Sequence, residues 1–379
     1  MIAWLLISFF VLLFLGVPIA MSLGLSAMGG ILFLGGGSTV TIAQRMFEGM
    51  NSFALLAIPL YTFAGFTMSK GGISKRLMDF CYSIVGHIYG GLAHVNVLSS
   101  MIFAGISGSA VADTAGVSGM FMPEMVRKGY SKNFTVAVTA ISSTIGIIIP
   151  PSIPMVVIAG ICGISTGKLF LGGIIPGVLC GLAQMIVSYF MAKKEGVPKE
   201  PGHFTIGPVL HGLWESWPAL LMPIIIVGTI TMGIVSPTEA GVIAVVYGLF
   251  AGGIIYRELK WEDIKFAFAE TVRTSGRIFI VIGAAKLYTV MLTTAGFDKW
   301  VAKTMLGFST NPTVILIVIL LIFFIVTMFM ESIATLTLFM PILYPIALGV
   351  GINPIVLSVL ITVVIGVGLV TPPVGMCIY

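Results

Sequence analysis

Apolar segments of about 20 residues recur from one end of the sequence to the other, which is the length that a helix needs to cross a membrane. Charged residues make up 9% of the chain, whereas a soluble globular protein carries about 25%. No region has the polar composition of a separate soluble domain. The sequence therefore predicts an all-α integral membrane protein. The first segment lacks a basic start and a small-residue cleavage site, so we interpret it as a retained helix rather than a signal peptide.

Short clusters of Lys and Arg between the apolar segments predict the orientation, because cytoplasmic loops are rich in these residues. The clusters are Lys70/Lys75/Arg76, Arg127/Lys128/Lys132, Lys193/Lys194/Lys199 and Arg257/Lys260/Lys265. All four lie inside only if residues 86–127 leave and return on the cytoplasmic side, and residues 311–350 do so on the outer side. We therefore expect two re-entrant helical hairpins, one from each face. Residues 1–34 fit either one crossing or two, and the amphipathic residues 261–277 predict an interfacial helix.

Two halves of the sequence share an ordered set of motifs. Asp113-Thr114 precedes the tripeptide FMP, and Glu331-Ser332 precedes the same tripeptide 218 residues later. The Pro-Pro pair at 150–151 recurs at 372–373, which is 222 residues later. Each half therefore predicts a hairpin followed by a helix broken at Pro-Pro, and hairpins that open to opposite faces make the repeats inverted. Inverted repeats with matching broken segments point to the midplane binding site of a secondary transporter.

The interrupted segments place oxygen atoms where the rest of the chain is apolar. Two consecutive prolines leave carbonyl groups of the preceding turn free. Hydroxyl groups close to the breaks or to the first hairpin tip belong to Ser107, Ser109, Ser152 and Thr371. Hard cations prefer oxygen ligands, so Na⁺ is the expected ion. The half-helix after each break directs its positive end to the same place, which favours a carboxylate substrate.

Asp113 and Glu331 are carboxylates at matching positions of the two halves, inside segments that are otherwise apolar. Charged groups at membrane depth are costly and usually functional. Two roles stay open for each of them: direct ligation of an ion, or capping of the helix that follows, from 114 or from 332. Ser236-Pro-Thr-Glu239 predicts a structural turn between two helices instead.

Other chemistries find little support in the sequence. The four histidines and four cysteines show no metal-ligand spacing, so no transition metal is expected. The chain contains no P-loop motif, so transport has to draw on an ion gradient or on a partner. A nucleophile at Ser107 or Ser109 would lack a nearby His or Lys as base. We therefore expect a transporter rather than an enzyme, and the paired hairpins favour alternating access over a channel.

Several stretches carry a family resemblance: GISGSAVADTAGVSG with FMPEM, then SSTIGIIIPPSIPM, SPTEAG and GLVTPPVGM. In this order they resemble the large membrane subunit of tripartite ATP-independent periplasmic (TRAP) transporters, over essentially the whole chain. The early motifs are most similar to the sialic-acid branch, and dicarboxylate members are close. The resemblance implies an elevator-type transporter of the ion-transporter superfamily, which imports an organic acid by Na⁺ symport. It also implies a periplasmic substrate-binding protein, a small four-helix membrane subunit and the bacterial inner membrane as location.

The resemblance also implies site residues. The first Na⁺ site of the family maps onto Ser107, Gly108, Gly146, Ile149 and Pro151. The second maps onto Gly366, Gly368, Thr371 and Met376, with Glu331 as the expected hairpin contribution. Substrate contact is expected at Ser109, Asp113 and Ser152. Family members continue beyond the TPPVGM motif, so a further helix is expected after Tyr379.

The expected domains follow from the two halves. Residues 1–85 and 169–297 are predicted to form the scaffold, the latter with the interfacial arm helix. Residues 86–168 and 298–379 are predicted to form the transport domain, each with one hairpin and one broken helix. One alternative stays open: a stand-alone Na⁺/dicarboxylate carrier of the same superfamily that needs no binding protein.

Overall fold

The computed structural model describes residues 1–35, 38–197 and 204–377, which form helices and contain no strand. The first group of helices is α1 (Ile2–Phe14), α2 (Ile19–Leu34), α3 (Thr39–Met50), η1 (Phe53–Leu56), α4 (Ala57–Lys70) and α5 (Ile73–Val85). The second group is α6 (Gly91–Ser107), α7 (Ala110–Arg127), α8 (Lys132–Ser143), η2 (Thr144–Ile147), α9 (Ile153–Cys162) and α10 (Thr166–Lys194). The third group is α11 (Ile206–Thr231), α12 (Pro237–Phe250), η3 (Ala251–Ile255), α13 (Trp261–Thr294), α14 (Phe297–Phe308), α15 (Pro312–Thr327), α16 (Ser332–Gly349) and α17 (Pro354–Gly368). The all-α prediction is confirmed for the described residues.

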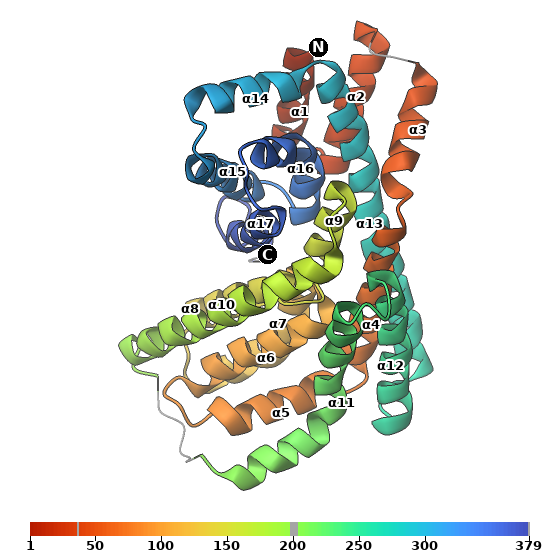
Figure 1. Cartoon of the computed structure of the whole chain (residues 1–379). Coiled ribbons are helices and arrows are strands. Elements are labelled where there is room, and N and C mark those ends of the chain that lie inside the picture. The colour runs from red at the N-terminus through yellow and green to blue at the C-terminus, as the bar shows by residue number, and fades with distance from the viewer. Residues whose placement is uncertain (36–37, 198–203, 378–379) are drawn as a thin grey trace.

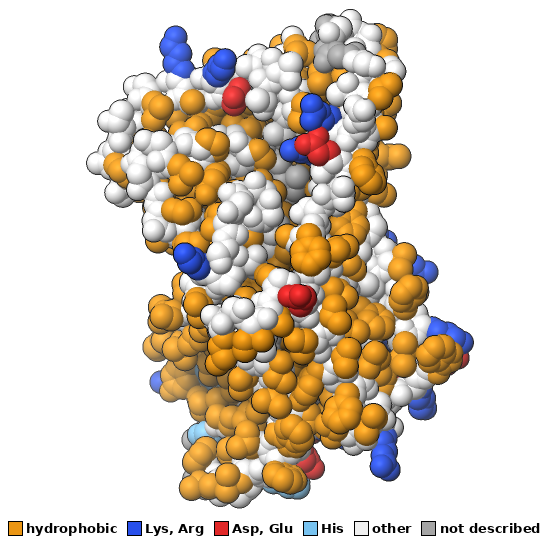
Figure 2. Space-filling model, turned by 45° about the vertical axis from the view of Figure 1, so that its right-hand side comes forward, with side chains coloured by type: hydrophobic (Ala, Val, Ile, Leu, Met, Phe, Trp, Pro, Cys, Tyr) orange, Lys and Arg blue, Asp and Glu red, His pale blue; other side chains and the backbone are white. Residues whose placement is uncertain are grey.

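Six helical segments of the described chain are long and apolar enough to cross a membrane: Phe53–Lys70, α10, α11, Pro237–Ile255, α13 and α16. Large hydrophobic side chains are exposed along the outer side of α10, including Ile175, Leu179 and Ile186. The face in Figure 2 is largely hydrophobic, and its Lys and Arg side chains are few and scattered. Such a surface suits contact with lipid chains, which supports a multi-pass membrane protein.

The longest helix, α13, runs along one side of the molecule and connects its two ends (Figure 1). It packs against α2, α3, α4 and α16. Its first half places Phe266 and Phe268 edge-on against Phe66 and Phe63 of α4. Its second half holds α1, because the Tyr288 hydroxyl donates to the carbonyl of Leu5 at 2.9 Å. The helix therefore contacts both α4, next to the first hairpin, and α16 of the second hairpin.

The structure decides the open question at residues 1–34 and corrects the prediction for residues 261–277. Residues 1–34 form two helices rather than one, because Gly16 adopts a positive φ of 80° and Pro18 precedes α2. Residues 261–277 are not a separate interfacial helix, since α13 continues without interruption over 34 residues. No proline lies within that stretch, so nothing removes a backbone donor and ends the helix. At about 1.5 Å per residue, α13 is longer than a hydrocarbon core of roughly 30 Å.

Two pairs of consecutive helices pack together where helical hairpins were expected. α6 packs against α7, and α15 packs against α16, each pair joined by a short tip. After each pair the next helix is interrupted: α8 and η2 end before Pro150-Pro151, and α17 ends before Pro372-Pro373. Both Pro-Pro bonds are cis. The division into scaffold and transport domains and the inverted relation of the halves stay predictions.

Candidate functional site

The tip of the first hairpin is a turn of two residues, Gly108 and Ser109. Gly108 has a φ of +66°, and a methyl group on it would overlap the carbonyl oxygen of Pro151. Only glycine meets both demands without strain. Ser109 is extended and caps α7, since its Oγ accepts from the amide of Ala112 at 3.4 Å. The polar run GISGS therefore ends one helix and begins the next.

Asp113 lies in the first turn of α7 and is fully buried, with 0% of its surface exposed. Its Oδ1 accepts a hydrogen bond from the Ser107 hydroxyl at the end of α6. Its Oδ2 has no hydrogen-bond partner among the described residues and faces Gly146, where an added methyl group would overlap it. Because Ser109 is the cap, the interpretation of Asp113 as the cap of a helix from 114 is wrong. The carboxylate is directed into the junction instead.

The first broken helix meets this tip through its main chain. The amide of Ile153 donates to the carbonyl of Gly108 at 3.1 Å, just after the Pro150-Pro151 pair. Ser152 is fully buried, caps α9 through the amide of Met155 at 3.3 Å, and donates to the carbonyl of Ile147 at 2.5 Å. The structure thus brings the residues predicted for the first Na⁺ site, apart from Ile149, together with those predicted for substrate contact. The first group is Ser107, Gly108, Gly146 and Pro151, and the second is Ser109, Asp113 and Ser152.

Ile149 contributes differently from the other predicted residues. Its side chain packs directly on Gly177 of α10, where a methyl group would overlap it. Its amide donates to the carbonyl of Ile145 at 3.0 Å. The side chain of Ile149 is therefore a packing contact with α10, and its amide is used within its own turn.

The tip of the second hairpin has a different carboxylate arrangement. Glu331 caps α16, since its Oε2 accepts from the amides of Ile333 at 2.9 Å and Ala334 at 3.2 Å. The Ser332 hydroxyl donates to Oε1 at 2.8 Å. Both carboxylate oxygens of Glu331 therefore have partners, in contrast to Asp113. Capping, which was one of the two roles open for this residue, is what the structure records for Glu331.

The second broken helix also meets its hairpin through the main chain. The amide of Val374 donates to the carbonyl of Met328 at 3.1 Å, just after Pro372-Pro373. A methyl group on Gly368 would overlap the hydroxyl of Thr327 at the end of α15. The Thr371 hydroxyl donates to the carbonyl of Val367 at 2.6 Å. Of the predicted second set, Gly368 therefore lies at the hairpin, whereas the Thr371 hydroxyl bonds within its own segment.

The remaining members of the second set point elsewhere. Gly366 faces the first break, where an added methyl group would lie 3.4 Å from Cβ of Thr144. Met376 has 39% of its surface exposed. Its neighbour Cys377 is buried beside Thr114 and close to Asp113. The two breaks thus touch each other. The sequence did not predict contacts for Thr114 and Thr144, although both lie inside conspicuous motifs, or for Cys377, which directly follows the last motif.

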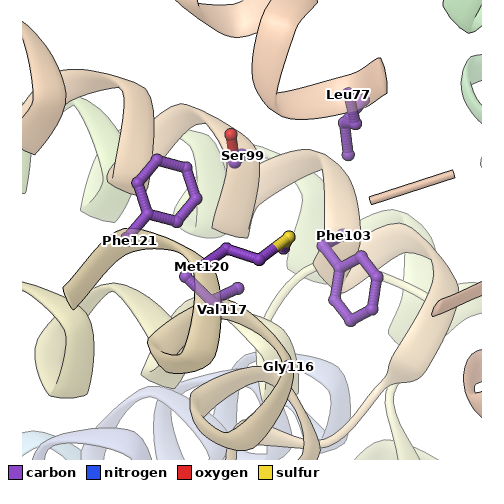
Figure 3. A pocket seen from close by; sticks show the side chains of 7 residues that line it. All are labelled: Leu77, Ser99, Phe103, Gly116, Val117, Met120 and Phe121. Atoms are coloured by element: carbon purple, nitrogen blue, oxygen red, sulfur yellow. The ribbon is translucent and has the colours of Figure 1, made fainter. Parts of the chain in front are cut away.

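A small cavity between α5, α6 and α7 is separate from this junction (Figure 3). Its lining is apolar except for Ser99, and it consists of Leu77, Ser99, Phe103, Gly116, Val117, Met120 and Phe121. No residue predicted for ion or substrate binding lines it. The Ser236–Glu239 turn is likewise structural, since Ser236 and Glu239 form a reciprocal capping box at the start of α12.

Comparison with known proteins decides the family. The family model described as "Tripartite ATP-independent periplasmic transporter, DctM component" matches residues 6–379. The chain belongs to this family. It is 36% identical to the sialic acid TRAP transporter large permease protein SiaM of Vibrio cholerae, over 97% of this chain and 86% of that protein. It is 37% identical to the C4-dicarboxylate TRAP transporter large permease protein DctM of Pseudomonas aeruginosa, over 94% of this chain and 84% of that protein.

Another relative of the DctM family is longer than this chain. The isethionate TRAP transporter permease protein DctMQ of Oleidesulfovibrio alaskensis is 38% identical over 98% of this chain, which spans 58% of that protein. The resemblance to the TRAP large membrane subunit is thereby confirmed. The chain is a transporter permease homologue and a multi-pass membrane protein.

Two solved transporters share the fold at low sequence identity. MtrF of Neisseria gonorrhoeae, described as one of a class of antimetabolite efflux pumps, has a TM-score of 0.59 at 13% identity, over 88% of this chain and 75% of that chain. The YdaH transporter of Alcanivorax borkumensis has a TM-score of 0.57 at 14% identity, over 89% of this chain and 79% of that chain. The likeness concerns the fold alone.

Proposed function

We propose that this chain is the membrane-embedded translocation subunit of a Na⁺-coupled secondary transporter that imports an organic acid. The observation that carries the proposal is Asp113 Oδ2, a buried carboxylate oxygen without a partner among the described residues. Burying an unpaired charge costs several kcal/mol, and a cation bound in the junction offsets that cost. The Ser107 hydroxyl and the Pro151 carbonyl lie at the same junction and are oxygen ligands of the kind that hard cations prefer.

The first Na⁺ site in this proposal contains Ser107, Gly108, Gly146 and Pro151, with the main chain of Ile149 and the carboxylate of Asp113 added. We assign Asp113 to the ion rather than to the substrate, because an anionic substrate would be repelled by it. The second Na⁺ site lies at the second break and draws on Gly366, Gly368, Thr371 and Met376. In that site Glu331 keeps its capping bonds and fixes the start of α16.

The substrate is proposed to bind at the ends of two half-helices. Ser109 at the hairpin tip caps α7, and Ser152 after the Pro-Pro break caps α9. The tip and the break are joined by the hydrogen bond between Ile153 and Gly108. The positive ends of both helices therefore converge on one place, which favours an anion. Isethionate, sialic acid and C4-dicarboxylates, the compounds in the names of the relatives, are all anionic at neutral pH. We propose a sialic acid or C4-dicarboxylate type of substrate.

An elevator movement is proposed for residues 86–168 and 298–379 as transport domain, against residues 1–85 and 169–297 as scaffold. Matching features of the two halves support the inverted repeat behind it. Gly146 and Gly368, 222 residues apart, each approach a hairpin tip so closely that a methyl group would overlap it. Each Pro-Pro pair is followed at once by a main-chain bond to a hairpin tip. A cation that joins tip and break holds the two parts of a half together while they move.

The word "tripartite" in the family description supports two further components. We propose that these are a periplasmic substrate-binding protein and a small four-helix membrane subunit, in the bacterial inner membrane. The alternative is a stand-alone Na⁺/dicarboxylate carrier.

Uptake into proteoliposomes separates the two candidates. With a Na⁺ gradient, uptake is expected only when the binding protein and the small subunit are present. Uptake by this chain alone at the same rate would favour the stand-alone carrier. Equal uptake with a K⁺ gradient in place of Na⁺ would refute Na⁺ coupling in both.

A further inference from the structure

A buried group of four polar side chains joins α6 to α8, and none of them belongs to the ion or substrate sets above. Asn96 and Ser100 lie one turn apart on α6, and Thr139 and Ser142 lie one turn apart on α8. Each of the four has at most 1% of its surface exposed. We call these four residues the α6–α8 polar network.

Three hydrogen bonds connect the network across the two helices. The Asn96 amide nitrogen donates to Thr139 Oγ1 at 2.9 Å, and the Ser142 hydroxyl donates to Asn96 Oδ1 at 2.8 Å. The Ser100 hydroxyl donates to Ser142 Oγ at 3.1 Å. Asn96 thus uses both ends of its amide on α8, and each serine hydroxyl meets a partner on the other helix.

The donors of the network follow one another in sequence, and the Ser142 hydroxyl has a second acceptor in reach, the carbonyl of Thr139 at 3.1 Å. The Thr139 hydroxyl gives its own proton to the carbonyl of Thr135 at 2.9 Å, so that its oxygen accepts from Asn96. The chain of donors runs from Ser100 through Ser142 to Asn96, and from Asn96 through Thr139 to the main chain of α8. Buried polar networks in which every member has a partner rigidify a core and specify one arrangement of it. Sliding α6 along α8 by one residue would break all three interhelical bonds.

The two helices end at opposite sides of the candidate ion site. α6 ends at Ser107, two turns beyond Ser100, and Gly146 follows Ser142 by a single turn. Ligand distances in an ion site are defined to about 0.2 Å, whereas one residue of a helix advances about 1.5 Å. The relative register of α6 and α8 therefore decides whether the oxygens on both sides of the junction reach one ion together.

We propose that the α6–α8 polar network sets the register of the first Na⁺ site, with Asn96 as its central positioning residue. This inference rests on the proposed function of that site. The network residues do not touch the ion; they act through the position of Ser107 and of the Thr144–Ile147 turn.

The test compares network variants with a control on the same helix. Asn96→Leu keeps the approximate volume and removes all interhelical amide bonds, and Ser142→Ala is the milder change. Thr135→Val is the matched control, because the Thr135 hydroxyl is equally buried but donates within α8, to the carbonyl of Ser131 at 2.9 Å. Two quantities are measured on the purified full chain: the dissociation constant for radiolabelled Na⁺, and the melting temperature in Na⁺-free K⁺ buffer.

Loss of groups that orient an ion's ligands typically weakens affinity by about 10- to 100-fold. We expect Asn96→Leu to raise the Na⁺ dissociation constant by about 10-fold or more, Ser142→Ala to raise it less, and Thr135→Val to leave it unchanged. Network variants that lower the melting temperature but keep the wild-type dissociation constant would overturn the proposal. If Asn96→Leu does not fold, Ser142→Ala against Thr135→Val decides in the same way. A wild-type chain without saturable Na⁺ binding would refute the proposed function itself.

Discussion

Replacing Gly146 by alanine tests whether the space beside Asp113 is where the ion binds. The added methyl group would overlap Asp113 Oδ2 and lie 3.4 Å from the carbonyl carbon of Ser109. Asp113 is fully buried and bonded to Ser107, so moving its carboxylate aside would disturb that bond. Overpacking of this kind costs about 1–3 kcal/mol. If the Na⁺-bound state bears that cost, the affinity for Na⁺ falls by about 5- to 150-fold.

The assay is Na⁺-dependent uptake in proteoliposomes that also contain the other components of the transporter. The half-saturating Na⁺ concentration is expected to rise by at least about fivefold in Gly146→Ala. Gly119→Ala is the control, because Gly119 lies on the exposed side of α7 and a methyl group there would meet nothing within 4 Å. A half-saturating concentration equal to that of the wild type, in a protein with a reduced melting temperature, would refute the reasoning.

Three further changes address the two carboxylates and the small cavity. Asp113→Asn removes a buried unpaired charge, so we expect a higher melting temperature in Na⁺-free buffer and a smaller increase on adding Na⁺ than in the wild type, because only the second site remains; a Na⁺-induced increase equal to that of the wild type would contradict the assignment. Glu331→Ala removes the cap of α16 and is expected to cost about 0.5–2 kcal/mol in unfolding free energy, and an unchanged stability would argue against the cap. Gly116→Ala adds a methyl group 3.7 Å from the Phe103 ring, and alanine favours the helical conformation by about 1 kcal/mol over glycine. The melting temperature should therefore rise, and a lower melting temperature would show that the fold requires the space of the small cavity.

Glycine and proline made much of the site predictable. Gly108 has a positive φ, and each Pro-Pro pair removes two consecutive backbone donors, and helices end at or just before these positions. The hairpin tip and the breaks could therefore be located from local sequence. Their meeting in space could also be expected, because irregular backbone at membrane depth has to be covered by protein.

The roles of individual polar residues were harder to predict. Asp113 and Glu331 occupy matching positions, yet Glu331 is the cap, whereas Ser109 caps the helix that contains Asp113. The capping residue is the one with an extended backbone just before the helix, which is Ser109 in the first tip and Glu331 in the second. The backbone conformation of each tip, and not the residue type alone, decides which residue this is. The sequence predicted a separate helix over residues 261–277, because the chain changes there from amphipathic to apolar. Such a change alters the surroundings of a helix but does not end it, so α13 continues to Thr294.

The bond between the Ile153 amide and the Gly108 carbonyl has a consequence for divergence within the family. Both partners belong to the main chain, so exchange of the side chain at position 153 leaves the bond in place unless that residue becomes proline, whereas Gly108 is held as glycine by its positive φ. Exchange of either side chain likewise leaves the bond between Val374 and Met328 in place unless residue 374 becomes proline. Other side chains around the junction can therefore be substituted during divergence while these main-chain bonds are retained. Relatives that share little more than a third of their residues with this chain, and whose names refer to chemically different acids, are compatible with one such frame.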